Sequence, residues 1–102
     1  MCQSLPKGTI NHRLVDQLIR SAGSIGANYR EANDAISKRD FIHRLRIARK
    51  EAKETSYWLD LIREANPERD DLMLTLRKET IELRNILSAI IQKSVAKGVE
   101  RV

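Results

Sequence analysis

Residues 38–65 read KRDFIHRLRIARKEAKETSYWLDLIREA, and this stretch decides the fold. Its apolar residues recur with the spacing of an α-helix that has one buried face. That face carries Phe41, Leu45, Ala48, Ala52 and Leu59. At about 100° per residue, the opposite side carries Arg39, Arg46, Lys50 and Lys53. The pattern predicts a helix from about Lys38 to Ala65 with one dry face and one cationic face.

Positive charge is concentrated in the first half of this predicted helix. The cations are Lys38, Arg39, Arg44, Arg46, Arg49, Lys50 and Lys53, and the anions between positions 38 and 53 are Asp40 and Glu51. Seven positive charges against two negative ones give +5, which equals the net charge of the whole chain. Cations spaced along a rigid helix can neutralise phosphates without reading base sequence. The candidate phosphate contacts are Arg39, Arg46, Arg49, Lys50 and Lys53.

A second interpretation of the same charges is a solvated outer face that only keeps the protein soluble. Acidic residues are interleaved along this helix, namely Glu51, Glu54, Asp60 and Glu64. Tyr57 continues the cationic face and Trp58 lies beside it. The two rings can stack on nucleic-acid bases, or they can pack near the end of a bundle helix.

Proline and glycine divide the chain into three long helical segments. We expect helices at about 10–35, 38–65 and 67–97, with a frayed tail at 98–102, and we find no strand pattern. Long helices joined by short turns lie antiparallel along each other. The sequence therefore predicts one all-α domain over residues 1–102, an up-and-down antiparallel helical bundle of the four-helix-bundle type with three long helices.

Local signals set the helix ends and the buried stripes. The predicted caps are Thr9 or Asn11, then Ser37 with Asp40, then Asn66 before Pro67, with Gly98 as the final stop. In the first helix the expected apolar stripe is Leu14, Leu18, Ile25, Tyr29, Ala32 and Ile36. In the third it is Leu72, Leu76, Leu83, Ile86, Leu87 and Ile90.

Small residues fill positions 21–27, SAGSIGA, in the middle of the first predicted helix. Glycine there costs about 1 kcal/mol relative to alanine. Gly23 and Ala27 fall opposite the apolar stripe, and Arg20 and Arg30 flank them. These four residues are a candidate subunit interface, because a small-residue notch between charges allows another backbone to approach closely. The alternative is a surface where small side chains are merely tolerated.

Glu79 lies between Leu76 and Leu83 on the side of the third helix expected to face the core. A carboxylate there needs a partner, so we predict a structural polar network of Asn28, Arg44 and Glu79. Neither His12 nor His43 has a second ligand at metal-binding spacing, and we find no catalytic or phosphate-loop motif. We therefore expect no enzymatic activity, no metal site and no cofactor.

Composition limits the compartment and the partners. The only cysteine is Cys2, so no disulfide can form within the chain. No apolar run approaches the roughly 20 residues that cross a bilayer, and we find no secretory signal. We expect a cytoplasmic protein without a membrane partner. A pI near 9.7 favours polyanions such as RNA or DNA.

Several segments of the sequence form a recognisable set: RSAGSIGANYREA at 20–32, DFIH at 40–43, IA at 47–48, KEAKET at 50–55, YWL at 57–59, Glu79 to Leu83 and Ser88 to Ile91. Together they resemble a bacterial family of four-helix bundle proteins encoded in intervening sequences of large-subunit ribosomal RNA genes. The resemblance covers nearly the whole chain from Leu14 onward. It implies a homo-oligomer, typically a pentamer, and a kinship with accessory proteins of diversity-generating retroelements, which have a basic surface.

The start of the chain departs from the family pattern. The family's first helix precedes the segment that here begins at Leu5, and only four residues come before Leu5. Either the true start of the chain lies upstream, or this member works with three helices and the family's N-terminal helix is mostly missing. Without that helix, part of the apolar stripes should be uncovered. At about 25 cal/mol per Å², exposing such a stripe is unfavourable, so we expect self-association to bury it.

The sequence thus favours a non-enzymatic, homo-oligomeric helical protein whose basic face binds RNA or another nucleic acid. The alternative is a protein-interaction scaffold or accessory protein, for example for a reverse transcriptase, that uses charge only for steering and has no direct nucleic-acid role.

Overall fold

The computed structural model describes the backbone of residues 8–101 and the side chains of residues 8–96. The elements are α1 (Thr9–Asn33), α2 (Lys38–Ala65), the 3-10 turn η2 (Pro67–Arg69) and α3 (Asp70–Arg101). No strand occurs over these residues. The predicted all-α fold with three long helices is confirmed.

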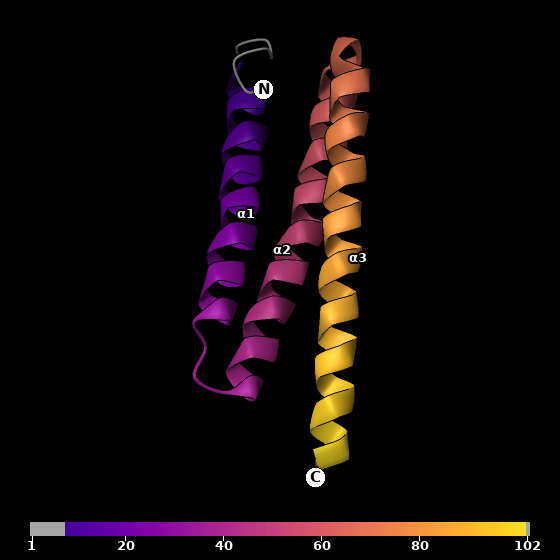
Figure 1. The fold of residues 1–102 in the computed structure, drawn as a ribbon. Coiled ribbons are helices and arrows are strands. Elements are labelled where there is room, and N and C mark those ends of the chain that lie inside the picture. Colours follow the sequence, from indigo (N-terminus) through magenta and orange to yellow (C-terminus); the bar gives the residue numbers. More distant parts are fainter. Residues whose placement is uncertain (1–7, 102) are drawn as a thin grey trace.

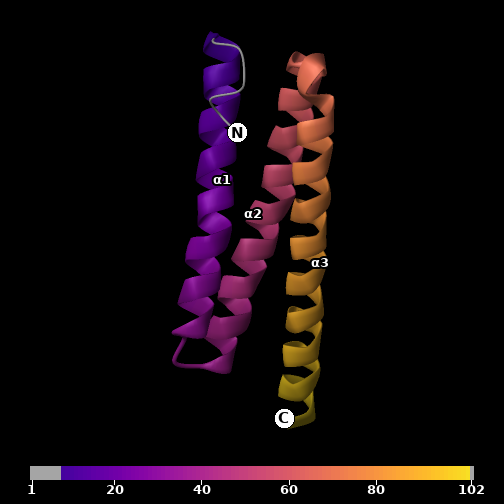
Figure 2. The ribbon, with the colours of Figure 1, turned by 45° about the horizontal axis from the view of Figure 1, so that its top comes forward.

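The three helices form an elongated up-and-down bundle with α2 as its central element (Figure 1). Helix α2 runs antiparallel to α1 and α3, which both point the same way (Figures 1 and 2). Both outer helices pack along α2, and the molecule measures 53 × 20 × 15 Å. One side of α2 therefore faces the two outer helices, and its other side stays free of them.

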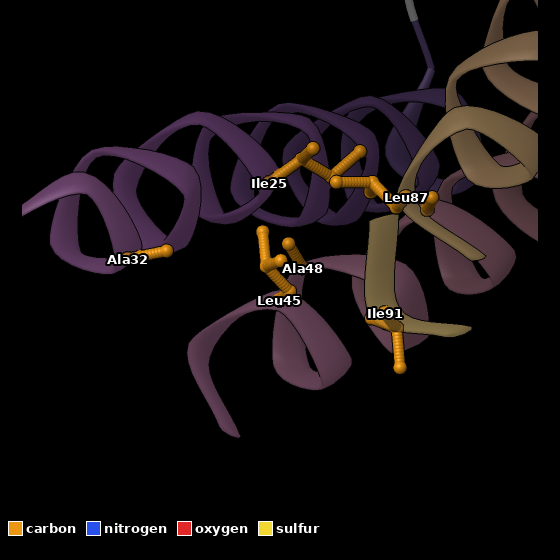
Figure 3. Packing of buried hydrophobic residues seen from close by; sticks show 7 residues of the cluster. Ile25, Ala32, Leu45, Ala48, Leu87 and Ile91 are labelled. Carbon is orange, nitrogen blue, oxygen red and sulfur yellow. The ribbon is translucent and has the colours of Figure 1, made fainter. Parts of the chain in front are cut away.

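Two apolar clusters hold the bundle together. Near the α1–α2 connection, the buried residues are Ile25, Ala32, Leu45, Ala48, Ala52, Leu87 and Ile91 (Figure 3). Toward the other end of α2, they are Leu18, Leu59, Ile62 and Met73. The face of α2 that the sequence assigned to the core is confirmed, because Leu45, Ala48, Ala52 and Leu59 are all buried and Phe41 is partly buried.

The connection between α1 and α2 contains the cap that the sequence predicts. The backbone N–H of Asp40 donates to Ser37 Oγ over 3.1 Å, which satisfies one of the unpaired donors in the first turn of α2. For α1, the predicted N-cap, Thr9 or Asn11, is wrong. Its N-cap is Gly8, which has no side-chain cap, and Thr9 is already helical. Asn11 instead directs its amide toward Asn66.

The connection between α2 and α3 contains a short 3-10 turn that the sequence did not predict. Pro67 follows Asn66 as predicted, but residues 67–69 form a 3-10 turn, and α3 begins at Asp70. The Asn66 side chain does not cap this turn, because its amide nitrogen donates to the carbonyl of Ile62 and to Asn11 Oδ1, both over 2.9 Å. The predicted stop at Gly98 is also wrong. Helix α3 continues to Arg101, since a glycine costs a helix only about 1 kcal/mol and does not by itself end it.

The apolar stripes of the outer helices differ in part from the prediction. Ile36 is 96% exposed, because α1 ends at Asn33 and Ile36 falls in the connection. On α3, Met73 and Ile91 are buried, although the sequence did not assign them to the core. Four residues assigned to the core are between 36% and 56% exposed, namely Tyr29, Leu72, Leu83 and Ile86. Within the described part of the chain, no helix is both long enough and apolar enough to span a membrane.

Candidate nucleic-acid interface

Four cations form what we call the basic face of α2: Arg39, Arg46, Lys50 and Lys53. They are exposed, and they lie on the side of α2 opposite the fully buried Leu45, Ala48 and Ala52. The helical period causes this separation, because positions 39, 46, 50 and 53 are related by steps of seven, four and three residues. The fifth predicted contact, Arg49, is half-buried at the margin of this face.

The acidic residues interleaved along α2 do not neutralise the basic face. Glu51 and Glu54 pair with Arg20 of α1, at 3.5 and 3.1 Å. Asp60 pairs with Arg77 of α3 at 2.8 Å. Among residues 8–96, none of the four basic-face cations has a carboxylate within 4.0 Å. The charge on this face is therefore available to a ligand.

The spacing of these cations suits a chain of phosphates. At 1.5 Å per residue, Arg39 and Lys53 are about 21 Å apart along the helix axis. Lys50 lies about 6 Å from Arg46 and about 4.5 Å from Lys53 on the same basis. A rigid helix of this kind can contact several successive phosphates while its opposite face remains in the core.

Tyr57 and Trp58 have different environments. Tyr57 is 56% exposed, one helical turn after Lys53. Trp58 is partly buried and packs against the cluster that contains Leu18 and Leu59. The ring centroids are 5.1 Å apart and the ring planes meet at 63°, an edge-to-face contact. The indole N–H is buried without an acceptor among the described residues. The core thus holds Trp58, and Trp58 supports the ring of Tyr57.

The residues of the predicted subunit interface lie on the outer side of α1. Gly23, Ala27 and Arg30 are exposed, as the sequence suggested. Arg20 is engaged within the chain, because it pairs with Glu51 and Glu54. A Cβ atom at Gly23 or Gly26 would have no neighbour within 4 Å. Packing inside the described chain therefore does not explain why these positions are glycine.

The predicted polar network is only partly present. Arg44 Nη1 donates to Asn28 Oδ1 over 3.5 Å, and Asn28 Nδ2 donates to the carbonyl of Ser24 over 2.9 Å. Glu79 does not join them, since it is exposed and its carboxylate has no ion pair within the described residues. Its side chain instead lines an open groove between α1 and α3.

An open groove between α1 and α3 is the main surface feature that the sequence did not locate. Its volume is about 460 Å³. It is lined by Ala22, Ile25, Gly26 and Tyr29 of α1, Thr55 of α2, and Leu76, Glu79, Thr80, Leu83 and Leu87 of α3. Exposed apolar side chains on its walls include Tyr29 and Leu83. The sequence predicted that part of the apolar stripes would be uncovered, but it did not predict where on the molecule the uncovered part lies.

The described residues hold no cluster of three or more His, Cys, Asp or Glu side chains able to bind a metal ion. His12 and His43 are both exposed and lie on different helices.

Comparison with known proteins gives a consistent family. The model of the 23S rRNA-intervening sequence protein family matches residues 1–89. A crystal structure from Bacteroides thetaiotaomicron, of a protein with unknown function from the S23 ribosomal protein family, is 41% identical in sequence. The match covers 76% of this chain and 72% of that chain, with a TM-score of 0.73. No curated protein matches at a comparable level.

Proposed function

The chain belongs to the 23S rRNA-intervening sequence protein family, and from this premise we propose that it is a non-enzymatic protein that binds RNA through the basic face of α2. The observation that carries the proposal is that four exposed cations lack acidic partners among residues 8–96, while nearby carboxylates pair with α1 and α3. A surface whose cations are paired with carboxylates attracts a polyanion only weakly. The cations of the basic face have no such pairs among the described residues.

The expected mode of binding is non-specific. Lys and Arg side chains that contact phosphates release condensed counterions, and this release drives association at moderate salt. Phosphate contacts position a protein on nucleic acid but carry no base information. We therefore expect similar affinities for RNAs of unrelated sequence and a strong dependence on salt concentration.

A charge-reversal experiment tests this proposal. Arg46→Glu combined with Lys50→Glu should weaken binding to a labelled RNA by about tenfold or more in a fluorescence anisotropy titration. The matched control is Lys78→Glu combined with Lys93→Glu, since both lysines are exposed on α3. Both double variants remove the same amount of positive charge. If both double variants lost the same affinity, binding would depend only on the overall charge of the protein. That result would contradict an interface on the basic face of α2.

We also propose that the protein self-associates and that a second copy covers the groove between α1 and α3. The support is the row of apolar side chains on its walls and the glycine at position 26, where a Cβ atom would have no neighbour within 4 Å among the described residues. A second copy seated on the groove would remove these apolar side chains from water. Five subunits, as the family resemblance implies, is the expected assembly.

The alternative to nucleic-acid binding is a scaffold or accessory protein that docks a different protein and has no direct nucleic-acid role. A pull-down after nuclease treatment separates it from nucleic-acid binding, because a protein partner retained without nucleic acid indicates direct docking. Loss of all partners after nuclease treatment supports binding through RNA. Cytoplasmic location is part of the same proposal, since RNA is the expected ligand.

A further inference from the structure

Tyr57 is a feature that phosphate contacts alone do not use. It lies four positions after Lys53 on the same side of α2, and more than half of its surface is exposed. Its hydroxyl forms no hydrogen bond within the described residues. An exposed aromatic ring at the end of a row of cations is an arrangement used to bind single-stranded nucleic acids.

Packing does not account for the position of Tyr57. Trp58, its neighbour, makes the contacts with the apolar cluster around Leu18 and Leu59. The edge-to-face contact between the two rings, with centroids 5.1 Å apart, restricts how the Tyr57 ring can turn. Tyr57 is therefore an exposed aromatic ring that contacts, on one side, a ring packed against the core.

The form of the nucleic acid follows from what such a ring can contact. In a duplex, base faces are stacked on one another and only base edges and the backbone are accessible. An unpaired base exposes its face and can stack on an aromatic side chain. A ligand that uses the cations and Tyr57 together must therefore have at least one unpaired base.

We propose that the ligand of the basic face is a single-stranded segment of nucleic acid, whose backbone follows Arg46, Lys50 and Lys53 and whose next base stacks on Tyr57. This inference rests on the proposed function and adds the strandedness of the ligand. It also divides the binding energy into two parts. The cations supply a part that falls with salt, and Tyr57 supplies a part that does not.

The test measures affinity for a single-stranded RNA and for the same sequence as a duplex, over a range of salt concentrations. Tyr57→Ala should weaken single-strand binding between about fivefold and a hundredfold, which is the range for loss of one stacked base. The slope of log K against log salt should not change. Tyr57→Phe should restore affinity, because the phenyl ring keeps the stacking face.

Two further variants control for folding and for the general loss of an exposed apolar side chain. Tyr57→Leu keeps apolar cover beside Trp58 without an aromatic face, so it should bind as weakly as Tyr57→Ala. Ile19 is 54% exposed on α1, outside the lining of the groove. Ile19→Ala should bind like the unmodified protein. Trp58, the only tryptophan, provides a fluorescence readout of the ring contact.

Each outcome has a distinct meaning. Tighter binding of the duplex, or unchanged single-strand affinity in Tyr57→Leu, would overturn the stacking proposal. If Arg46→Glu with Lys50→Glu still weakens binding in that case, the phosphate interface stands and only the strandedness is wrong. Equal loss for DNA and RNA strands agrees with the proposal, because the contacts invoked are phosphates and a base face.

Discussion

Asn11 and Asn66, which are 55 positions apart, exchange two amide hydrogen bonds. Asn11 Nδ2 donates to Asn66 Oδ1 over 3.1 Å, and Asn66 Nδ2 donates to Asn11 Oδ1 over 2.9 Å. The pair ties the first turn of α1 to the connection between α2 and α3. Asn66 is only 1% exposed, so its amide depends on these bonds and on the carbonyl of Ile62.

Replacing Asn66 with alanine should lower the free energy of unfolding by about 2 kcal/mol, because it leaves buried polar groups without partners. Asn11→Ala should cost less, since Asn11 is only half-buried and water can reach the groups left behind. Urea unfolding followed by circular dichroism measures both. A loss below about 0.5 kcal/mol for Asn66→Ala would contradict the structural role of the pair.

Truncating a side chain in the core should destabilise the protein much more than truncating one in the α1–α2 connection. Leu45 is fully buried, so Leu45→Ala should lower the free energy of unfolding by between about 2 and 5 kcal/mol. Ile36 is almost fully exposed, so Ile36→Ala should change it by less than about 0.5 kcal/mol. The same unfolding assay serves both variants. A large effect at Ile36 would mean that the connection is covered in solution.

The groove should control the oligomeric state. Leu83 lies on its wall and is 37% exposed, and Leu74 is exposed to a similar extent, 42%, on α3 outside the groove lining. Leu83→Glu should reduce the mass measured by sedimentation velocity, because a carboxylate is costly to bury at an interface. Leu74→Glu should leave the mass unchanged. If neither variant alters the mass of an oligomer, the groove is not its interface.

Arg20 should affect nucleic-acid binding without touching the ligand. Arg20→Gln releases Glu51 and Glu54, whose negative charges would then act on the basic face. We expect affinity for RNA to fall between about twofold and fivefold at low salt. The Arg20–Glu54 pair is exposed and contributes little to stability. Glu51 is only 13% exposed, so the loss of its partner should lower the free energy of unfolding by about 1 to 3 kcal/mol.

The control for Arg20 is Arg63→Gln, which removes one positive charge and frees Asp70 on α3 instead. Anisotropy titrations at two salt concentrations compare the variants. Equal affinities for the two would show that the pairing of Glu51 and Glu54 has no influence on binding.

Helix α2 could be predicted from the sequence because its residues divide cleanly into two faces. Leu45 and Ala48 fall on one side and Arg46 and Lys50 on the other, so the helical period alone fixes which side is buried. Ser37 and Asp40 also marked its start, because a capping bond is made within a few residues. Local patterns of this kind need no information about the other helices.

Helix α3 could not be oriented in the same way. Apolar residues occur around much of its circumference, including the buried Met73, Leu87 and Ile91 and the exposed Leu72, Leu83 and Ile86. The sequence pattern does not determine which of these stripes faces α2. Three of the six residues assigned to the core are therefore exposed, and Glu79 was placed in the core with them. The Asn11–Asn66 pair was missed because nothing local links two positions so far apart.

The most direct test of the account is the salt dependence of RNA affinity when all four basic-face cations, Arg39, Arg46, Lys50 and Lys53, are changed to alanine. Each phosphate contact on a single strand contributes about 0.7 to the slope of log K against log salt. We predict that the variant loses between about 2 and 3 from this slope. A slope equal to that of the unmodified protein would contradict the claim that the basic face of α2 contacts phosphates.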